Sequence, residues 1–459
     1  MLFDFADLEL KNRGELYYSL YIKIKEAAEC GAIKKGEKLP SIREAATQLG
    51  VSRTTVENAY TRLCIEGIAE SRPQRGYFIT GNKNKFKSNT IKSKVKPQNI
   101  EYDFSSRSID TAAADTELWK RTLRSVLWDS SLLTSYGEKQ GEMKLREALV
   151  NYSYKARGVK AEAENIVIGA GVGPLLNILC GLVGREVTVG IENGGFAEAE
   201  GIFSDYGIKT VLLDSDSNGA TLKSIKENEV DMLFLLPSAL SKISVSALNN
   251  RRNEFVKWAE NIKDRFIIED DYNGELRYTA RTVTSFQGKS PENTVYIGSF
   301  SKLLLPSVRI AYMVLPHLLA ERLRERETGY NQTCGKIEQL ALAEYILKGA
   351  LEKQLRRLRR IYYNKSQILC RELKDRIPDS SIILYESSLT VELLTNCTEK
   401  SAVICSQALK NGIKLIKSNK RGTVRLCFAG INEEKIPEAA ERLSKVFKEL
   451  EIVKIANKN

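Results

Sequence analysis

Apolar residues along most of the chain gather in short runs that alternate with helical patterns. Runs typical of buried strands lie near 166–169, 187–191, 208–213, 231–236, 266–269, 294–298 and 310–314. Such alternation predicts an α/β fold with a mostly parallel seven-stranded sheet, covered on both faces, and a site at the carboxyl ends of the strands. Beyond about residue 333 the pattern changes to long basic helices and strands near 381–394 and 423–428. This change predicts a smaller C-terminal α+β subdomain over roughly 333–459.

The first eighty residues follow another pattern. A helical run from Leu16 to Cys30 is followed by Ser41 and Glu44 in the spacing of a capping box, which predicts the start of a second helix. A tight turn at Gly50 leads to a third helix that begins near Ser52. Helix, turn and helix at this spacing are typical of a unit that reads DNA.

A short polar hairpin over residues 71–79 follows the third helix and predicts a wing with Arg75 and Gly76 at its tip. With the elements L-P-S-x-R, S-R-T-T-V, A-Y and R-G-Y, residues 1–80 resemble the winged helix-turn-helix domain of GntR-type transcription regulators. The resemblance implies contacts with the phosphates or bases of double-stranded DNA. The residues that it assigns to these contacts are Ser41, Arg43, Ser52, Arg53, Thr54, Thr55, Arg75 and Gly76. Tyr60 fits the core of such a domain as well as it fits a DNA contact.

Two strand ends carry the candidate chemistry of the chain. The loop that follows strand 294–298 carries Ser299, Ser301, Lys302 and Arg309. Strand 266–269 leads in the same way to Asp270 and Tyr272. Pyridoxal 5'-phosphate (PLP) requires a lysine for a Schiff base, a carboxylate at its ring nitrogen, a donor near its phenolic oxygen and a cradle for its phosphate. These two strand ends can supply all four.

From about residue 102 to the C-terminus the chain resembles the fold-type I PLP enzymes of the aspartate aminotransferase kind. The resemblance implies that Lys302 forms the Schiff base, that Asp270 faces the ring nitrogen and that Tyr272 reaches the phenolic oxygen. It assigns the phosphate to Ser299, Ser301 and Arg309. The two acids that flank Asp270 are expected to be structural, because a strand end points only alternate side chains at one site.

Three further segments add to this resemblance. A strand runs into a glycine-rich turn and a helix, where Gly171, Val172 and Gly173 can offer backbone N–H groups to the phosphate. Tyr136, in Y-G-E-K-Q-G, resembles the tyrosine that reaches the phosphate of the neighbouring subunit, which implies a homodimer. Arg425, in T-V-R-L-C-F, resembles the arginine that binds the carboxylate of an amino-acid substrate. An arginine between apolar residues also fits the exposed face of a strand.

Two segments depart from the pattern of these enzymes. Residues 237–244 read P-S-A-L-S-K-I-S where P-S-H-Q-x-P-T-G is expected, so the polar side chains that usually approach the ring are missing. Phe196 stands where it can stack on the ring, but it brings no hydroxyl group. We therefore expect a sensor domain rather than a working transaminase.

The order of the two resemblances identifies the chain as a member of the MocR-type regulators, with a GntR-like reader over 1–80 and an aminotransferase-like sensor over 101–459. Between them, residues 81–100 predict a flexible linker that is solvated or assists in holding DNA phosphate. Its lysines are Lys83, Lys85, Lys87, Lys92, Lys94 and Lys96. The family implies a transcription regulator that senses an amino acid, an amine or a pyridoxal-like ligand by aldimine exchange at Lys302. Two alternatives stay open: an active aminotransferase with an accessory DNA-binding domain, and a regulator whose PLP-free sensor serves as a dimerisation scaffold.

Composition sets limits on these interpretations. The 459 residues include 70 basic and 58 acidic side chains, which gives a formal net charge of +12. Residues 1–80 hold twelve basic and eleven acidic side chains and are nearly neutral. The sequence motif, rather than the charge, therefore indicates DNA binding. Eight cysteines without a C-x-x-C pair and a single histidine, His317, argue against a metal site, a disulfide framework and a Ser-His or Cys-His mechanism. The sequence shows no apolar run of membrane-spanning length and no signal segment, so we expect a cytoplasmic protein.

Overall fold

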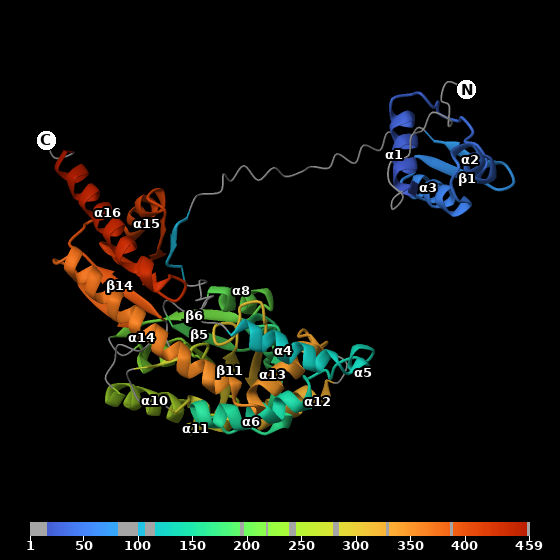
Figure 1. Cartoon of the computed structure of the whole chain (residues 1–459). Coiled ribbons are helices and arrows are strands. Elements are labelled where there is room, and N and C mark those ends of the chain that lie inside the picture. Colours follow the sequence, from blue (N-terminus) through green and yellow to red (C-terminus); the bar gives the residue numbers. More distant parts are fainter. Residues whose placement is uncertain are drawn as a thin grey trace. The chain divides into compact units, whose positions relative to one another are not determined.

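The computed structural model describes residues 16–80, 100–105, 115–192, 197–216, 219–237, 245–278, 284–326, 330–385 and 389–456. The chain forms two compact units, Met1–Lys96 and Pro97–Asn459 (Figure 1). Most of the predicted linker, Phe196 and residues 238–244 lie outside the described residues. Within the described ranges, no helix is both long enough and apolar enough to cross a membrane.

The first unit has the three helices and the hairpin that the sequence predicts. Its elements are α1 (Leu16–Glu29), α2 (Ile42–Leu49), α3 (Arg53–Ile65), β1 (Ala69–Arg72) and β2 (Gly76–Ile79). The Ser41 side chain caps α2 by accepting from the backbone N–H of Glu44 at 3.2 Å, and the Ser52 side chain caps α3 through the N–H of Thr55 at 3.1 Å. Gly50, at φ +62°, ends α2 in the left-handed conformation that glycine adopts without strain.

The wing is an antiparallel pair in which Arg72 lies opposite Gly76. Lys38 adds a bridge to Phe78 of β2, so the segment before α2 is tied to the wing. Tyr60 is fully buried and donates a hydrogen bond to the Pro40 carbonyl oxygen at 3.1 Å. Tyr60 is therefore a core residue of this unit.

The second unit contains the predicted seven-stranded sheet. Its strands, in spatial order, are β4 (Ile166–Gly169), β12 (Ala311–Val314), β11 (Thr294–Ser299), β10 (Phe266–Asp270), β9 (Met232–Leu235), β5 (Thr188–Glu192) and β6 (Lys209–Leu213). Only β12 among them runs antiparallel to its neighbours. The strands are apolar on both faces because helices cover both sides, which explains why they appear in the sequence as continuous apolar runs.

The helices around this sheet precede its first strand, connect its strands or follow its last strand (Figure 1). They are α4 (Thr116–Leu127), α5 (Ser130–Leu133), α6 (Met143–Arg157), α7 (Val172–Val183), α8 (Ala197–Asp205), α9 (Leu222–Glu227), α10 (Val245–Glu260), α11 (Phe286–Lys289), α12 (His317–Glu325) and α13 (Lys336–Leu347). Val167 and Ile297 point into the core beneath α7, α8 and α12. Ile168 and Tyr296 point into the opposite core, which includes α4, α6 and α13.

A small hairpin, β7 (Ser215–Asp216) with β8 (Gly219–Ala220), precedes α9.

The C-terminal part forms a second, antiparallel sheet in the order β13-β14-β17-β16. Its elements are α14 (Ala350–Arg376), β13 (Ser381–Tyr385), β14 (Thr390–Leu394), α15 (Ser401–Lys410), β15 (Ile413–Lys414), β16 (Ile416–Lys417), β17 (Thr423–Cys427) and α16 (Ile436–Ala456). The short strand β3 (Tyr102–Asp103) pairs in parallel with β15. The beginning of the second unit thus belongs to its C-terminal sheet, a pairing across some three hundred residues that hydrophobic periodicity did not predict.

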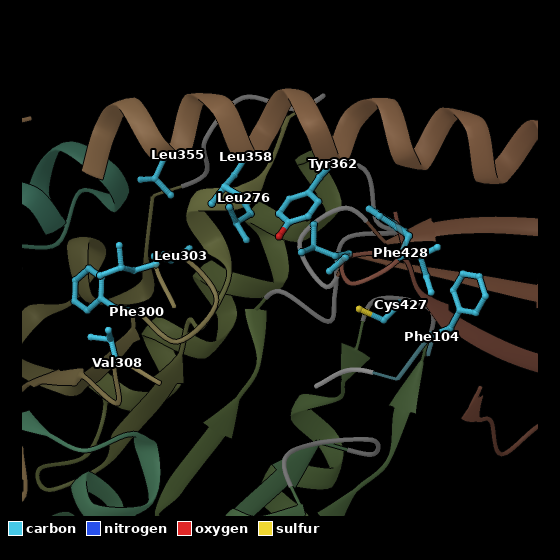
Figure 2. Close-up of a cluster of buried hydrophobic side chains, with 14 of the residues drawn as sticks. Phe104, Leu276, Phe300, Leu303, Val308, Leu355, Leu358, Tyr362, Cys427 and Phe428 are labelled. Carbon is cyan, nitrogen blue, oxygen red and sulfur yellow. The ribbon is translucent and has the colours of Figure 1, made fainter. Parts of the chain in front are cut away.

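Helix α14 joins the two sheets of the second unit. In Figure 2 the side chains of Leu355, Leu358 and Tyr362 on this helix point towards Leu276 and the loop that follows β11. Phe300, at 0% exposure, anchors that loop in the same core. Burying such side chains stabilises the fold by roughly 1.5–3 kcal/mol each. The loop that carries the candidate chemistry therefore begins from a fixed position.

Candidate functional site

The candidate site lies at the carboxyl edge of the seven-stranded sheet. Strands β10 and β11 run in parallel with Asp270 opposite Ile297, so Asp270 and the loop after Ser299 emerge at the same edge. Strand β4, which precedes the glycine-rich turn, also ends there, because β12 lies between β4 and β11 and pairs Ala311 with both Gly169 and Ser299. Side chains from three separate segments of the sequence are thereby brought to one edge, as predicted.

Lys302 occupies the turn that follows β11. Its Nζ lies 5.0 Å from the centre of the Tyr272 ring. Its neighbours Phe300 and Leu303 are buried in the core, which holds the turn in place. Burial lowers the pKa of the Lys302 ammonium from its usual value, and the nearby Cys427 opposes this effect. A lowered pKa increases the fraction of neutral amine, which is the nucleophilic form.

Asp270 is buried at the end of β10, opposite Ile297 of the strand that leads to the Lys302 loop. Burial, reinforced by the neighbouring Asp271, raises the pKa of Asp270 to about 7. Within the described part of the chain, its Oδ1 atom has no hydrogen-bond partner. A buried carboxylate oxygen without a donor is costly, so this atom is suited to a cationic N–H group supplied by a ligand.

Ser299, Ser301 and Arg309 converge beside the amino end of α7. Arg309 donates from Nη1 to Ser301 Oγ at 3.2 Å, and the Ser301 N–H donates to Ser299 Oγ at 3.4 Å. Gly171, at φ +107°, precedes α7, and a Cβ atom there would lie 2.7 Å from Arg309 Nη2. The first turn of α7, which starts at Val172, has no side-chain cap. Free N–H groups, hydroxyls and a guanidinium together form a site for a phosphate.

The residue that follows Asp270 forms a buried ion pair. The Nε atom of Arg157, at the end of α6, lies 2.5 Å from Asp271 Oδ2, and both side chains are buried. Tyr296 donates its hydroxyl to the same carboxylate oxygen at 3.2 Å. Asp271 is thus structural, as the alternation along the strand predicts.

The other flanking acid, Glu269, has a similar structural role. Arg252 of α10 lies 3.5 Å from one of its oxygens, and the Gln287 N–H donates to the other at 3.1 Å. A fourth buried acid, Glu275, accepts from the Tyr152 hydroxyl at 3.2 Å, and burial together with Asp271 raises its pKa to about 7. The local sequence offered no signal for these partners, because each comes from a distant helix.

The remaining predicted residues of the sensor have different surroundings. Tyr136 is fully exposed and does not reach the site of its own chain. Arg146 holds the segment next to it by donating to the Gly141 carbonyl at 2.8 Å and to Glu138 at 2.8 Å. Arg425 lies on β17 and donates from Nε to Glu392 at 2.8 Å, a partner that sequence reasoning missed.

The predicted DNA-contact residues lie around the start of α3, the start of α2 and the wing. The exposed ones are Ser41, Arg43, Ser52, Arg53, Thr54 and Arg75, whereas Thr55 and Gly76 are half-buried. Arg53 and Thr54 occupy the first turn of α3. In a helix-turn-helix unit, the first turn of the recognition helix is the part that contacts base edges.

Comparisons with known proteins agree with both units. Residues 16–79 match the family model of bacterial regulatory proteins of the gntR family, and residues 101–443 match aminotransferase class I and II. The chain is 34% identical to the uncharacterized HTH-type transcriptional regulator YdeL of Bacillus subtilis, over 94% of this chain and 97% of that protein. It is 27% identical to the HTH-type pyridoxine biosynthesis transcriptional regulator PdxR of Corynebacterium glutamicum, over 86% of this chain and 86% of that protein. It is 25% identical to the probable rhizopine catabolism regulatory protein MocR of Rhizobium meliloti, over 95% of this chain and 94% of that protein.

Solved structures resemble the second unit in fold. The α-aminoadipate aminotransferase LysN of Thermus thermophilus, complexed with N-(5'-phosphopyridoxyl)-L-leucine, superimposes with a TM-score of 0.67 at 20% identity, over 78% of this chain and 94% of that one. Kynurenine aminotransferase of Pyrococcus horikoshii gives a TM-score of 0.66 at 22% identity, over 77% and 92%. At this level of identity the likeness concerns the fold alone, and it agrees with the predicted fold-type I architecture.

The raised pKa of Asp270 predicts how stability depends on pH. The folded chain keeps a proton on Asp270 up to about pH 7, whereas the unfolded chain loses it near its usual pKa of 3.8. Between these values stability must fall as the pH rises, on the order of a few kcal/mol. Relative to Asp270→Asn, the PLP-free wild type should therefore lose unfolding free energy between pH 4 and pH 8 in urea denaturation. Exposed Asp379→Asn is the control, and wild-type and Asp270→Asn curves that run parallel would contradict the assignment.

Proposed function

The chain belongs to the HTH-type transcriptional regulators in which a GntR domain precedes a domain of aminotransferase class I and II, and we propose that PLP bound at Lys302 makes it a sensor of an amino compound. The observation that supports this most directly is the incomplete site around Lys302. One edge of the sheet offers an amine with a lowered pKa, a buried carboxylate oxygen without a donor and an arginine-bearing anion cradle. These are the groups that PLP needs, so the residues fit the cofactor.

Each residue at this edge has a separate task in the proposal. When bound, PLP supplies an aldehyde that condenses with a primary amine. Lys302 would provide that amine, while Asp270 would accept the ring N–H and hold it protonated. Ser301 and Arg309 would hold the phosphate at the start of α7. The buried ion pair of Asp271 with Arg157 would keep the carboxylates of β10 in register.

In the proposed response, an incoming ammonium would give up a proton and take the place of Lys302. Lys302 would then be free to accept that proton, which would place a positive charge beside Cys427 on β17 of the C-terminal sheet. Such a charge can favour a different position of that sheet against the large one. The ligand can shift DNA binding only by as much as its affinity differs between the two arrangements.

We further propose that the protein is a homodimer that binds double-stranded operator DNA in the cytoplasm. The GntR domain implies DNA binding, and two domains per dimer imply paired half-sites. Two exposed aromatic side chains in the segment after α4 support the dimer, since Trp128 is 92% exposed and Tyr136 is fully exposed. Tyr136 would complete the phosphate site of the partner.

Substitution of Lys302 tests the cofactor assignment. Wild-type protein saturated with PLP should show a visible absorption band, and borohydride reduction followed by peptide mass analysis should locate the added phosphopyridoxyl group on Lys302. Lys302→Ala should lose the band while keeping its fold, because the side chain contributes little to the core. Lys302→Arg keeps the charge and should also lose the band, whereas exposed Lys348→Ala should retain it. Absence of a band in the wild type, or a label on another lysine, would contradict the assignment.

Substitution of Arg53 tests the DNA-contact assignment. With a duplex that the full-length protein selects from a random library, Arg53→Ala should weaken binding by about 1–3 kcal/mol if Arg53 meets a base edge. If Arg53 meets a phosphate instead, the slope of log affinity against log salt should fall by roughly one charge. Arg371→Ala removes an exposed arginine from the other unit and serves as the control. Unchanged affinity and an unchanged salt slope in Arg53→Ala would refute the assignment.

A further inference from the structure

Arg425 is already paired with a carboxylate of its own chain. Strands β14 and β17 are antiparallel neighbours with Glu392 directly opposite Arg425. The Nε atom of Arg425 donates to Glu392 Oε2 at 2.8 Å, within the range of a charge-assisted hydrogen bond. The ring of Tyr385 lies on the same guanidinium, with its centre 5.7 Å from Cζ. The guanidinium is therefore held in place by groups of the C-terminal sheet.

The two members of this pair differ in their exposure to water. The Glu392 side chain is 1% exposed, whereas the Arg425 side chain is 44% exposed. A buried carboxylate depends on its cationic partners, because water cannot solvate it. Lys420 also lies near Glu392, with its Nζ 3.9 Å from Oε1. Much of the positive charge of Arg425 is therefore offset by Glu392.

Strand β17 carries both Arg425 and Cys427, and Cys427 packs in the same hydrophobic core as Leu303, the residue next to Lys302. Side chains alternate along a strand, so Arg425 and Cys427 of β17 share one face, and Glu392 shares it as the cross-strand partner of Arg425. The electrostatic influence of Cys427 on the pKa of Lys302 agrees with this proximity. A ligand amine bound in place of Lys302 would therefore have Arg425 and Glu392 as neighbours.

We propose that Glu392 excludes carboxylates from this site and that the ligand is an amine without a carboxylate next to its amino group. A carboxylate that approached Arg425 would share one guanidinium with the buried carboxylate of Glu392, and the two like charges would repel one another. An uncharged group at the same place meets no such repulsion. This inference rests on the proposed function, and it replaces the expected carboxylate clamp with a neutral ion pair.

The test compares probes of the same shape that differ in charge. Full-length wild-type protein loaded with PLP is titrated with L-phenylalanine, L-phenylalaninamide and 2-phenylethylamine, and binding is followed by the visible band and by calorimetry. The carboxamide should bind at least about tenfold more tightly than the carboxylate. Phenylethylamine should also bind more tightly than L-phenylalanine. Since this comparison uses the wild type, it does not depend on the folding of any variant.

Substitution of Glu392 then assigns the preference to this residue. Glu392→Gln keeps the shape but removes the charge, so the ratio of the carboxamide to the carboxylate affinity should fall at least about tenfold. Glu392→Asp keeps the charge and should retain the wild-type preference. Glu438→Gln makes the same charge change at an exposed pair with Arg442 on α16, and should leave the ratio as it is.

The possible failures have different meanings. If the visible band is present but L-phenylalanine binds more tightly than L-phenylalaninamide, this inference alone is overturned. The same holds if Glu392→Gln leaves the ratio of the carboxamide to the carboxylate affinity unchanged. Absence of a band, or a band that none of the three amines perturbs, overturns the proposed function and this inference with it.

Discussion

The ion pair between Arg157 and Asp271 is the interaction on which the site depends. Three consecutive buried acids stand at the end of the central strand β10, and burial raises the pKa of Glu269 and of Asp270. Arg157 lies 2.5 Å from Asp271 and offsets its charge. Removing one member of such a pair leaves a buried charge alone, at a cost of about 3–5 kcal/mol. The ion pair holds the Asp271 side chain in the core. Because successive side chains along a strand point to opposite sides, the Asp270 side chain then points to the site.

Among the residues that the structure describes, this edge leaves one buried carboxylate oxygen, Oδ1 of Asp270, without a hydrogen-bond partner. Asp270 keeps a pKa raised to about 7, and the ammonium of Lys302 has a lowered one. Both shifts have the same cause, which is the cost of charge where water is scarce. A ligand that brings a cationic ring nitrogen, an aldehyde and a phosphate would relieve these penalties together. In the proposed function, the stability lost at this edge in the free protein would be recovered as affinity for such a ligand.

Local patterns in the sequence predicted the strands, the helix caps and the residues at the strand ends, because each of these depends on nearby residues. Ser41 and Ser52 cap their helices as the capping pattern predicts. Pairings between distant segments were missed, among them Arg157 with Asp271, Glu392 with Arg425 and β3 with β15. A lone arginine in a helix or strand has no local feature that reveals its partner, and only the register of the folded sheets brings such residues together.

The central claim is that one chain couples an amine site to a DNA reader, and thermodynamic linkage tests it most directly. The affinity of the PLP-loaded full-length protein for its selected duplex is measured with and without a saturating amine that perturbs the visible band. We expect the amine to change that affinity at least about fivefold, and the duplex to change the amine affinity by the same factor. Both effects should vanish in Lys302→Ala. Equal DNA affinities in the presence and absence of an amine that does perturb the band would contradict the account.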